Sequence, residues 1–232
     1  MKFLGKFCEC FCKCNAQEKA FTLAEVLVTL GIIGVVSAMT LPTLVKNHQR
    51  TVYVTQLQKV VTELSQAAEK AAQEYNAISL DETKYNDSNP NGARDFLNDN
   101  FKVVNNCGAD LTPCFASEYK TLQGKSYTLE SPIAVVTLAS GASISIIHNY
   151  MYYEQGYHGN YDLQVDVNGP QGPNILGRDL FTLGLYSDGK VAEHYSYIDD
   201  DGWRFEENCS TGEVYGFGCF DKIVNDGWKM DY

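Results

Sequence analysis

The hydrophobic positions of the chain begin with one long uninterrupted run near the N-terminus. From Val26 to Val45, twenty consecutive residues carry no charge, and Glu25 is the one charged residue between Phe21 and Val45. Twenty residues at the rise of an α-helix cover about 30 Å, the thickness of the hydrocarbon core of a bilayer. Residues 21–45 are therefore predicted to form a transmembrane helix, with Pro42 removing one backbone donor and kinking or loosening it.

A helical pattern continues from Lys46 to Tyr75, but here apolar and polar positions alternate with the helical period. The apolar positions recur at spacings of three and four residues: Val54, Leu57, Val61, Leu64, Ala68, Ala71 and Tyr75. This amphipathic spacing predicts a stripe that packs on a globular head. Because no cap or glycine separates this segment from the apolar run, the two are expected to form one helix of about fifty residues.

The remainder of the chain shows loop and strand patterns. Residues 76–100 are polar, with a loop at 86–92 and a short helix expected at 93–101. Strand-type runs follow at 133–138, 142–148, 163–167, 180–186 and 191–198, the first two joined by a turn at Ser140–Gly141. Short turns between strands imply antiparallel pairing. The predicted fold is α+β, with a long N-terminal helix packed on an antiparallel sheet.

Charge and composition divide the chain into a leader and an acidic remainder. Residues 1–20 hold four lysines and two acids, while the whole chain has a net charge of −11. Removal of this +2 leader would leave a chain of −13. Such a charge argues against nucleic acid as a direct partner, since phosphate binding needs clustered Lys and Arg. In a secretory signal the apolar region precedes the cleavage site, whereas here the small residue Ala20 comes first.

The eight cysteines form two groups. Four lie in the leader, at alternate positions from Cys8 to Cys14, and four in the head: Cys107, Cys114, Cys209 and Cys219. If the apolar run spans a membrane, the head group faces an oxidising compartment, where an even count predicts two disulfides. Of the three possible connectivities, the pairs Cys107–Cys114 and Cys209–Cys219 are favoured because short loops are the easiest to close. The alternate spacing of the leader cysteines is poorly suited to tetrahedral zinc.

The segment Lys19-Ala20-Phe21-Thr22-Leu23-Ala24-Glu25, followed by the apolar helix and Pro42, resembles the N-terminus of type IV pilin-like proteins. That family includes type IV pilins, competence pilins and the pseudopilins of type II secretion systems. With Phe21 as the first mature residue, Glu25 is fifth and Pro42 twenty-second, as in the family. Two residues depart from its pattern: Ala20 stands where glycine is usual, and Ala24 where a larger aliphatic residue is usual.

The resemblance implies both a processing pathway and an assembly mode. Prepilin peptidase would cleave between Ala20 and Phe21, and the new N-terminus at Phe21 would be methylated. Glu25 would then pair with the free amine of a neighbouring subunit, which offsets the several kcal/mol, roughly, that a carboxylate costs in hydrocarbon. The chain would be a structural subunit of a pilus or pseudopilus. Its partners would be further copies, other pilin-like subunits, the peptidase and an inner-membrane assembly platform.

Two alternatives stay open from the residues. Glu25 lies one turn into the apolar run, so its carboxylate could instead reach the membrane interface. The whole chain could also be an unprocessed, signal-anchored binding protein or adhesin.

The lysines of the leader place the N-terminus in the cytoplasm, with the head outside the bacterial inner membrane. Secretion, adhesion, motility and DNA uptake are not distinguished by the sequence, nor is a major from a minor subunit.

The head offers one candidate metal site. Oxygen-bearing side chains cluster in a Gly- and Pro-rich stretch: Asp162, Asp166, Asn168, Asn174 and Asp179. Calcium prefers hard oxygen ligands on a turning loop, and the family resemblance adds to this expectation. Asp166, Asn168, Asn174 and Asp179 are therefore candidate calcium ligands, with ordinary turn chemistry as the alternative. Position twelve of a loop starting at Asp166 is Gly177, where an EF-hand would need an acid.

Other features of the head are weaker signals. Tyrosines gather between His148 and His158, a density that could bind a sugar or a protein, or pack on the sheet. The acidic run at 199–201 is typical of a solvated turn, and Trp203 and Trp228 of core positions. The four histidines are dispersed and no hydrolase, metalloprotease or phosphate-loop motif occurs, so the chain is not expected to be an enzyme.

Overall fold

The computed structural model describes residues 21–86, 88–148, 159–193, 209 and 218–232. The chain divides into two compact units, residues 1–45 and residues 46–232. The first contains the apolar run and the second contains the head. Each unit is described by itself below.

In the first unit the apolar run is helical throughout. It forms the N-terminal part of α1 (Leu23–Glu74), which continues through Pro42. An 18-residue window of α1 has a mean hydropathy of 2.0, and none of that window is buried within the molecule. Gly31 and Gly34 have open space where a Cβ would lie. So much exposed apolar surface is unfavourable in water and favourable in the hydrocarbon of a bilayer. The helix is therefore consistent with the predicted membrane span.

In the second unit α1 buries one stripe against the head. The fully or almost fully buried positions are Tyr53, Val54, Leu57, Val60, Leu64, Ala67, Ala68 and Ala71. The predicted stripe is confirmed at Val54, Leu57, Leu64, Ala68 and Ala71, and Val61 is partly buried and packs against the same core. Val60 is buried in addition. Tyr75 lies outside the stripe: α1 ends at Glu74, and Tyr75 is 43% exposed.

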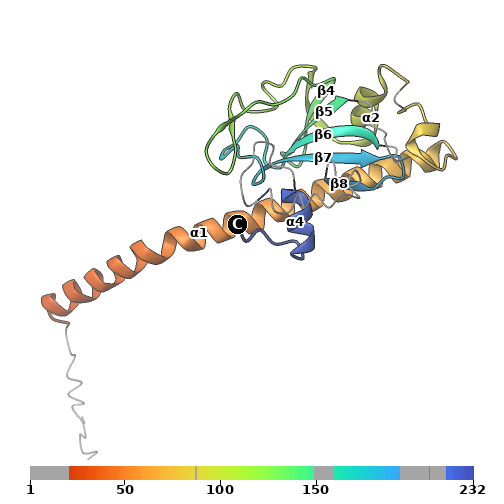
Figure 1. Ribbon diagram of the computed structural model, residues 1–232. Helices are drawn as coiled ribbons and strands as arrows, with labels where there is room; N and C mark the ends of the chain where they lie inside the picture. Colours follow the sequence, from red (N-terminus) through yellow and green to blue (C-terminus); the bar gives the residue numbers. More distant parts are fainter. Residues whose placement is uncertain (1–20, 87, 149–158, 194–208, 210–217) are drawn as a thin grey trace, which may run out of the picture. The chain divides into compact units, whose positions relative to one another are not determined.

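The head is built on one antiparallel sheet of six strands, which packs on α1 (Figure 1). The strands are β1 (Val103–Gly108), β4 (Ala134–Leu138), β5 (Ser143–His148), β6 (Gly159–Asp166), β7 (Leu180–Tyr186) and β8 (Val191–Glu193), in the spatial order β1-β4-β5-β6-β7-β8. The side chains of Ile144, Leu163 and Leu183 lie on the face that joins the α1 stripe in the core. The predicted α+β architecture is confirmed.

Strands with regular apolar runs were predictable, and short or polar ones were not. The hairpin of β4 and β5 and the strands β6 and β7 lie where the apolar runs predict them, and the described part of 191–198 gives β8. The turn between β4 and β5 uses Gly141 at φ +92°, a conformation that favours glycine. Elements missed by the sequence pattern are β1, β2 (Tyr119–Lys120), β3 (Ser126–Tyr127) and α4 (Cys219–Asn225).

β1 is an edge strand, and its pairing with β4 is irregular. The register shifts between Val103 and Asn105 and again between Asn106 and Gly108. Val104, which lies within the first of these shifts, is 63% exposed. Such bulges locally disrupt the hydrogen-bond ladder and bend an edge strand.

A short helical region closes the end of the sheet nearest the C-terminal end of α1. It consists of η1 (Leu80–Glu82) and α2 (Gly92–Asn100), the latter one residue earlier than predicted at each end. Phe96 of α2 packs edge-on against Tyr85 and lies 5.4 Å, centroid to centroid, from Tyr161 of β6. The Tyr161 hydroxyl donates a hydrogen bond to the Tyr85 carbonyl. These contacts tie the region after α1 to the middle of the sheet.

The described residues contain two disulfides, with the pairing that short loops favour. Cys107 bonds Cys114, and Cys209 bonds Cys219. The first links β1 to the loop that carries β2 and β3. The second fixes the start of α4, whose Phe220 and Ile223 are buried in the core.

Candidate functional site

The N-terminus of α1 is closed by a reciprocal pair of side chains, Thr22 and Glu25. The Thr22 backbone N–H and its Oγ1 hydroxyl each donate a hydrogen bond to Glu25 Oε2, both at 2.8 Å. In return the Glu25 N–H donates to Thr22 Oγ1 at 3.2 Å. Thr22 is the N-cap and Glu25 the third helical residue, which is the arrangement of a capping box.

This arrangement gives the carboxylate a local role that the sequence analysis did not include. A helix N-terminus leaves backbone N–H groups without partners and carries a partial positive charge. Glu25 satisfies one such donor and lies where a negative charge is favourable. The sequence signal for this role is Thr-x-x-Glu directly before an apolar run.

One oxygen of Glu25 remains available for a second partner. Among the described residues, hydrogen bonds to this side chain all end on Oε2, and Oε1 accepts none. Phe21, one residue before the cap, is 84% exposed, and Leu23 is 78% exposed. The site therefore presents a fixed carboxylate beside an exposed aromatic at the end of an exposed apolar helix. Ala20, the other half of the predicted cleavage site, lies outside the described residues.

The four candidate calcium ligands lie in and around the connection from β6 to β7, where their side chains shape the turn. Asp179 is fully buried and accepts the N–H of Asn174 at 2.7 Å and that of Ile175 at 2.6 Å. Asn168 donates to the carbonyls of Gln171 and Gly172. These are the hydrogen bonds by which Asp and Asn stabilise tight turns.

Asp166 anchors a neighbouring loop rather than facing an open site. Its Oδ2 accepts the Tyr119 hydroxyl of β2 at 2.5 Å, and its Oδ1 accepts the Asn168 N–H at 3.2 Å. Burial, with the nearby charge of Asp179, raises the pKa of Asp166 to about 7. Burial likewise raises the pKa of Asp179.

The four candidate ligands divide into two kinds: the two carboxylates are hydrogen-bonded within the protein, whereas the side-chain oxygens of Asn168 and Asn174 are buried without a hydrogen-bond partner among the described residues. Within the described part of the chain, no three His, Cys, Asp or Glu side chains are grouped to hold a metal. The carboxylates of Asp166 and Asp179 are taken up by O–H and N–H donors of the protein. Calcium binding at Asp166, Asn168, Asn174 and Asp179 stays a prediction, and turn chemistry is what the geometry shows.

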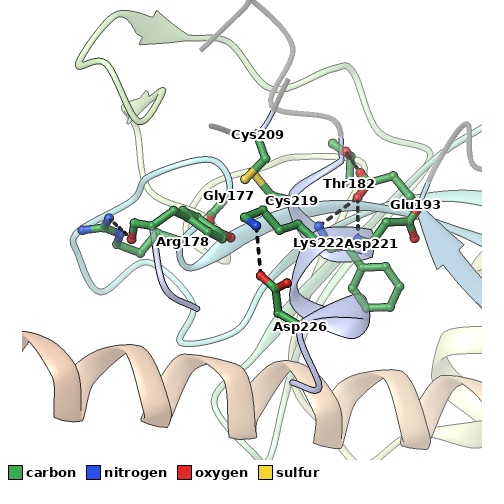
Figure 2. The surroundings of a disulfide bond; sticks show 11 residues. Gly177, Arg178, Thr182, Glu193, Cys209, Cys219, Asp221, Lys222 and Asp226 are labelled. Atoms are coloured by element: carbon green, nitrogen blue, oxygen red, sulfur yellow. Dashed lines mark hydrogen bonds and ion pairs between the residues drawn. A yellow bond between two sulfur atoms is a disulfide. The ribbon is translucent and has the colours of Figure 1, made fainter. Parts of the chain in front are cut away.

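A further buried acid, Glu193 of β8, lies against the start of α4 (Figure 2). The Glu193 carboxylate accepts the Phe220 N–H at 2.9 Å and the Asp221 N–H at 3.4 Å. Burial raises the pKa of Glu193 to about 8. Sequence analysis did not single out Glu193, because it reads as one polar residue at the end of a strand. Its position next to Cys219 makes it part of the anchor that holds α4 to the sheet.

Gly177 lies directly against the same disulfide (Figure 2). A Cβ built on Gly177 would be 2.5 Å from Cys219 Sγ, and the residue has φ +82°. Its carbonyl accepts the Tyr232 hydroxyl at 2.7 Å. The β6–β7 connection, the disulfide and the C-terminal segment thus meet at a position that accommodates glycine alone.

Several predicted features fall outside the described residues. They are the leader with its cysteines, the tyrosine-rich stretch after His148, the acidic run at 199–201 and Trp203. Trp228 is half-buried and packs edge-on against Phe220, as a core residue does.

Comparison with known proteins identifies the N-terminal segment. Residues 15–41 match the prokaryotic N-terminal methylation motif, which is the type IV pilin signature. The match covers Ala20, Phe21, Thr22 and Glu25 and stops just before Pro42. No curated protein and no solved structure matches the chain. The motif and the apolar helix fit a membrane-anchored, pilin-like subunit that is processed at its N-terminus.

Proposed function

We propose that this chain is a structural subunit of a type IV pilus-like or type II secretion pseudopilus filament. Prepilin peptidase cleaves it after Ala20, Phe21 is methylated, and the mature chain assembles through α1. The methylation motif matched at residues 15–41 carries the proposal, because this range contains the proposed cleavage site, Glu25 and most of the apolar run. The exposed apolar surface of α1 supports it, since that surface is available to pack on other helices.

The geometry at Thr22 and Glu25 suggests how cleavage prepares the chain for assembly. Before cleavage, Phe21 is joined to the leader by a neutral peptide bond. Hydrolysis of the Ala20–Phe21 bond creates an ammonium one residue from the cap. The hydrogen bonds to Oε2 already fix the orientation of the Glu25 side chain. Its Oε1 can therefore accept a hydrogen bond from the ammonium of a neighbouring copy while Oε2 keeps the cap. A preorganised carboxylate binds with little loss of side-chain entropy.

The proposed location follows from the same segment. A single pass through the bacterial inner membrane, with the leader in the cytoplasm, puts the head on the extracytoplasmic side, where its two disulfides are stable. The proposed partners are further copies, other pilin-like subunits, the peptidase and an inner-membrane assembly platform. No catalytic role is proposed for the chain, since the motif is one of structural subunits.

N-terminal sequencing and mass analysis of the membrane-extracted protein test this proposal. The expected N-terminus is Phe21, with a mass increase of one methyl group. An intact Met1 in cells that contain active prepilin peptidase would overturn it and favour a signal-anchored binding protein. A peptidase-deficient strain is the matched control, and it should retain the leader.

A further inference from the structure

A groove on the head is rimmed by lysines although the chain as a whole is strongly acidic. It has a volume of about 460 Å³ and lies between α1, the α2–β1 junction and the β4–β5 turn. Lys59 and Lys70 approach from α1, and Lys102 from the start of β1. Its floor is apolar, formed by residues that are buried or partly buried: Ala67, Phe101 and Leu138. We call it the lysine groove.

The groove has a surplus of positive charge. Glu63 is the one acid among its lining residues, and it pairs with Lys59 at 3.8 Å. Lys70 pairs with Glu74, outside the groove, at 3.5 Å, and Lys102 makes no ion pair with any described residue. The side chains of Lys59 and Lys70 are 59% and 58% exposed, and pairs this exposed contribute little. The lysines are therefore free to turn to a stronger acidic partner.

A complementary surface lies elsewhere on the same head, just after α1 ends. Ile78 is 90% exposed, the highest value among the large apolar residues of the described chain. Asp81 and Glu82 follow it, both exposed, on η1. The Ile78 N–H donates to Glu82 Oε2 at 2.9 Å, which holds that carboxylate next to the isoleucine. We call residues 78–82 the acidic knuckle.

From these two surfaces we infer that the lysine groove binds the acidic knuckle of a second copy of this chain. An exposed isoleucine flanked by two acids matches an apolar floor rimmed by three lysines. The charge match offsets the general repulsion between copies of a chain whose net charge is −11. The inference rests on the proposed assembly of the chain and adds a contact between its heads.

The relation between the two surfaces is compatible with a filament. Groove and knuckle are different patches of one head, so a copy that fills one groove can still offer its own groove to the next copy. In the proposed filament the contact is then made head to tail, by each copy in turn. The contact is small, and it acts together with the packing of the α1 helices rather than alone.

Cross-linking of the full-length chain in its native membrane and filaments tests the contact. With a photoreactive amino acid in place of Ile78, we expect cross-links between two copies. The linked peptide should contain a groove residue, such as Lys70, Phe101 or Lys102. The double variant Lys70→Glu and Lys102→Glu should lower the cross-link yield about tenfold or more, since like charges then face each other.

A charge exchange and a matched control make the result specific. Asp81→Lys with Glu82→Lys, expressed beside the groove double variant, should restore the cross-link between the two different copies. Lys120→Glu with Lys125→Glu changes the charge equally at exposed positions outside the groove and should leave the yield unchanged.

Four results would overturn the inference: cross-links outside the groove, cross-links to another protein, equal yield from the groove variant, or assembled filaments without an Ile78 cross-link between copies. These results leave the proposed function standing if the chain begins at Phe21 and filaments form. A chain that keeps Met1 and never assembles would overturn both.

Discussion

The Glu25 carboxylate accepts two hydrogen bonds of 2.8 Å from Thr22, one from the backbone and one from the hydroxyl. The same acid that the proposed assembly needs is therefore also a structural part of its own helix. Capping and intersubunit pairing make different demands on this side chain. Capping needs an oxygen acceptor, whereas pairing with an ammonium in hydrocarbon needs a charge.

The substitution Glu25→Gln separates these two roles. Glutamine can keep the capping box through its amide oxygen but has no charge. We expect normal membrane insertion and cleavage, with filament yield reduced about tenfold or more, because losing an ion pair in an apolar environment costs more than about 1.4 kcal/mol. Immunoblots of sheared filaments against membrane fractions measure this ratio. If the Gln variant gave the wild-type filament yield, the charge of Glu25 would not be needed for assembly, and its role would be limited to capping the helix.

The substitution Thr22→Ala tests the cap from the other side. It removes the hydroxyl that bonds Glu25 and should destabilise the first turn of α1 by about 1 kcal/mol. Amide hydrogen exchange of residues 23–26 in micelles should accelerate, while Thr22→Ser should exchange at the wild-type rate. Unchanged exchange in the alanine variant would mean that the cap does not hold the turn. Filament yield should fall less than in Glu25→Gln.

A methyl group at Gly177 should destabilise the head. Alanine there would place Cβ 2.5 Å from Cys219 Sγ at φ +82°. We expect the free energy of unfolding to fall by about 2–4 kcal/mol, from backbone strain and overpacking together. Denaturant unfolding of the full chain in detergent, followed by a probe in the head, measures this loss.

Gly124 provides the matched control for that measurement. It has φ +80° but no atom within 4 Å of a built Cβ. Gly124→Ala therefore carries the backbone strain without the clash and should lose only about 1–2 kcal/mol. Equal losses at the two glycines would show that the disulfide contact is not tight.

Asp166 should make the stability of the head depend on pH. Its pKa is raised to about 7 in the folded chain, against about 4 when unfolded. Between these values the folded chain binds more protons than the unfolded chain, so the free energy of unfolding falls as pH rises from about 4 to about 7. Asp166→Asn should show a shallower fall over this window than the wild type. If the free energy of unfolding changed with pH by the same amount in both proteins, Asp166 would not contribute to the pH dependence.

The elements that could be predicted are those whose own residues show a regular apolar pattern. The apolar run and the stripe around Leu57 and Leu64 indicate α1, and the apolar alternation around Ile144 indicates the β4–β5 hairpin. β1 was missed because its residues are half-exposed and include Asn105 and Asn106, which favour turns. α4 has seven residues, too few for a helical period to show.

The candidate site divides in the same way. The N-terminal motif could be predicted because cleavage, capping and membrane insertion depend on residues that are adjacent in sequence. The roles of Asp166 and Glu193 could not be, because their partners lie far away along the chain. Tyr119 is 47 residues before Asp166, and Phe220 is 27 residues after Glu193. The sequence shows that oxygen-bearing side chains are close to Asp166. It does not show that the Tyr119 hydroxyl donates a hydrogen bond to Asp166 Oδ2.

In the filament proposed for this chain, the bulged edge of β1 would limit how neighbouring heads can join. A filament would bring many identical sheets close together, and a straight free edge on each could zip to the next and fuse heads irreversibly, as in amyloid. The two register shifts between β1 and β4 interrupt the row of backbone donors and acceptors that such fusion requires. In the proposed filament, the edge of β1 would therefore lie against neighbouring heads without pairing with them irreversibly.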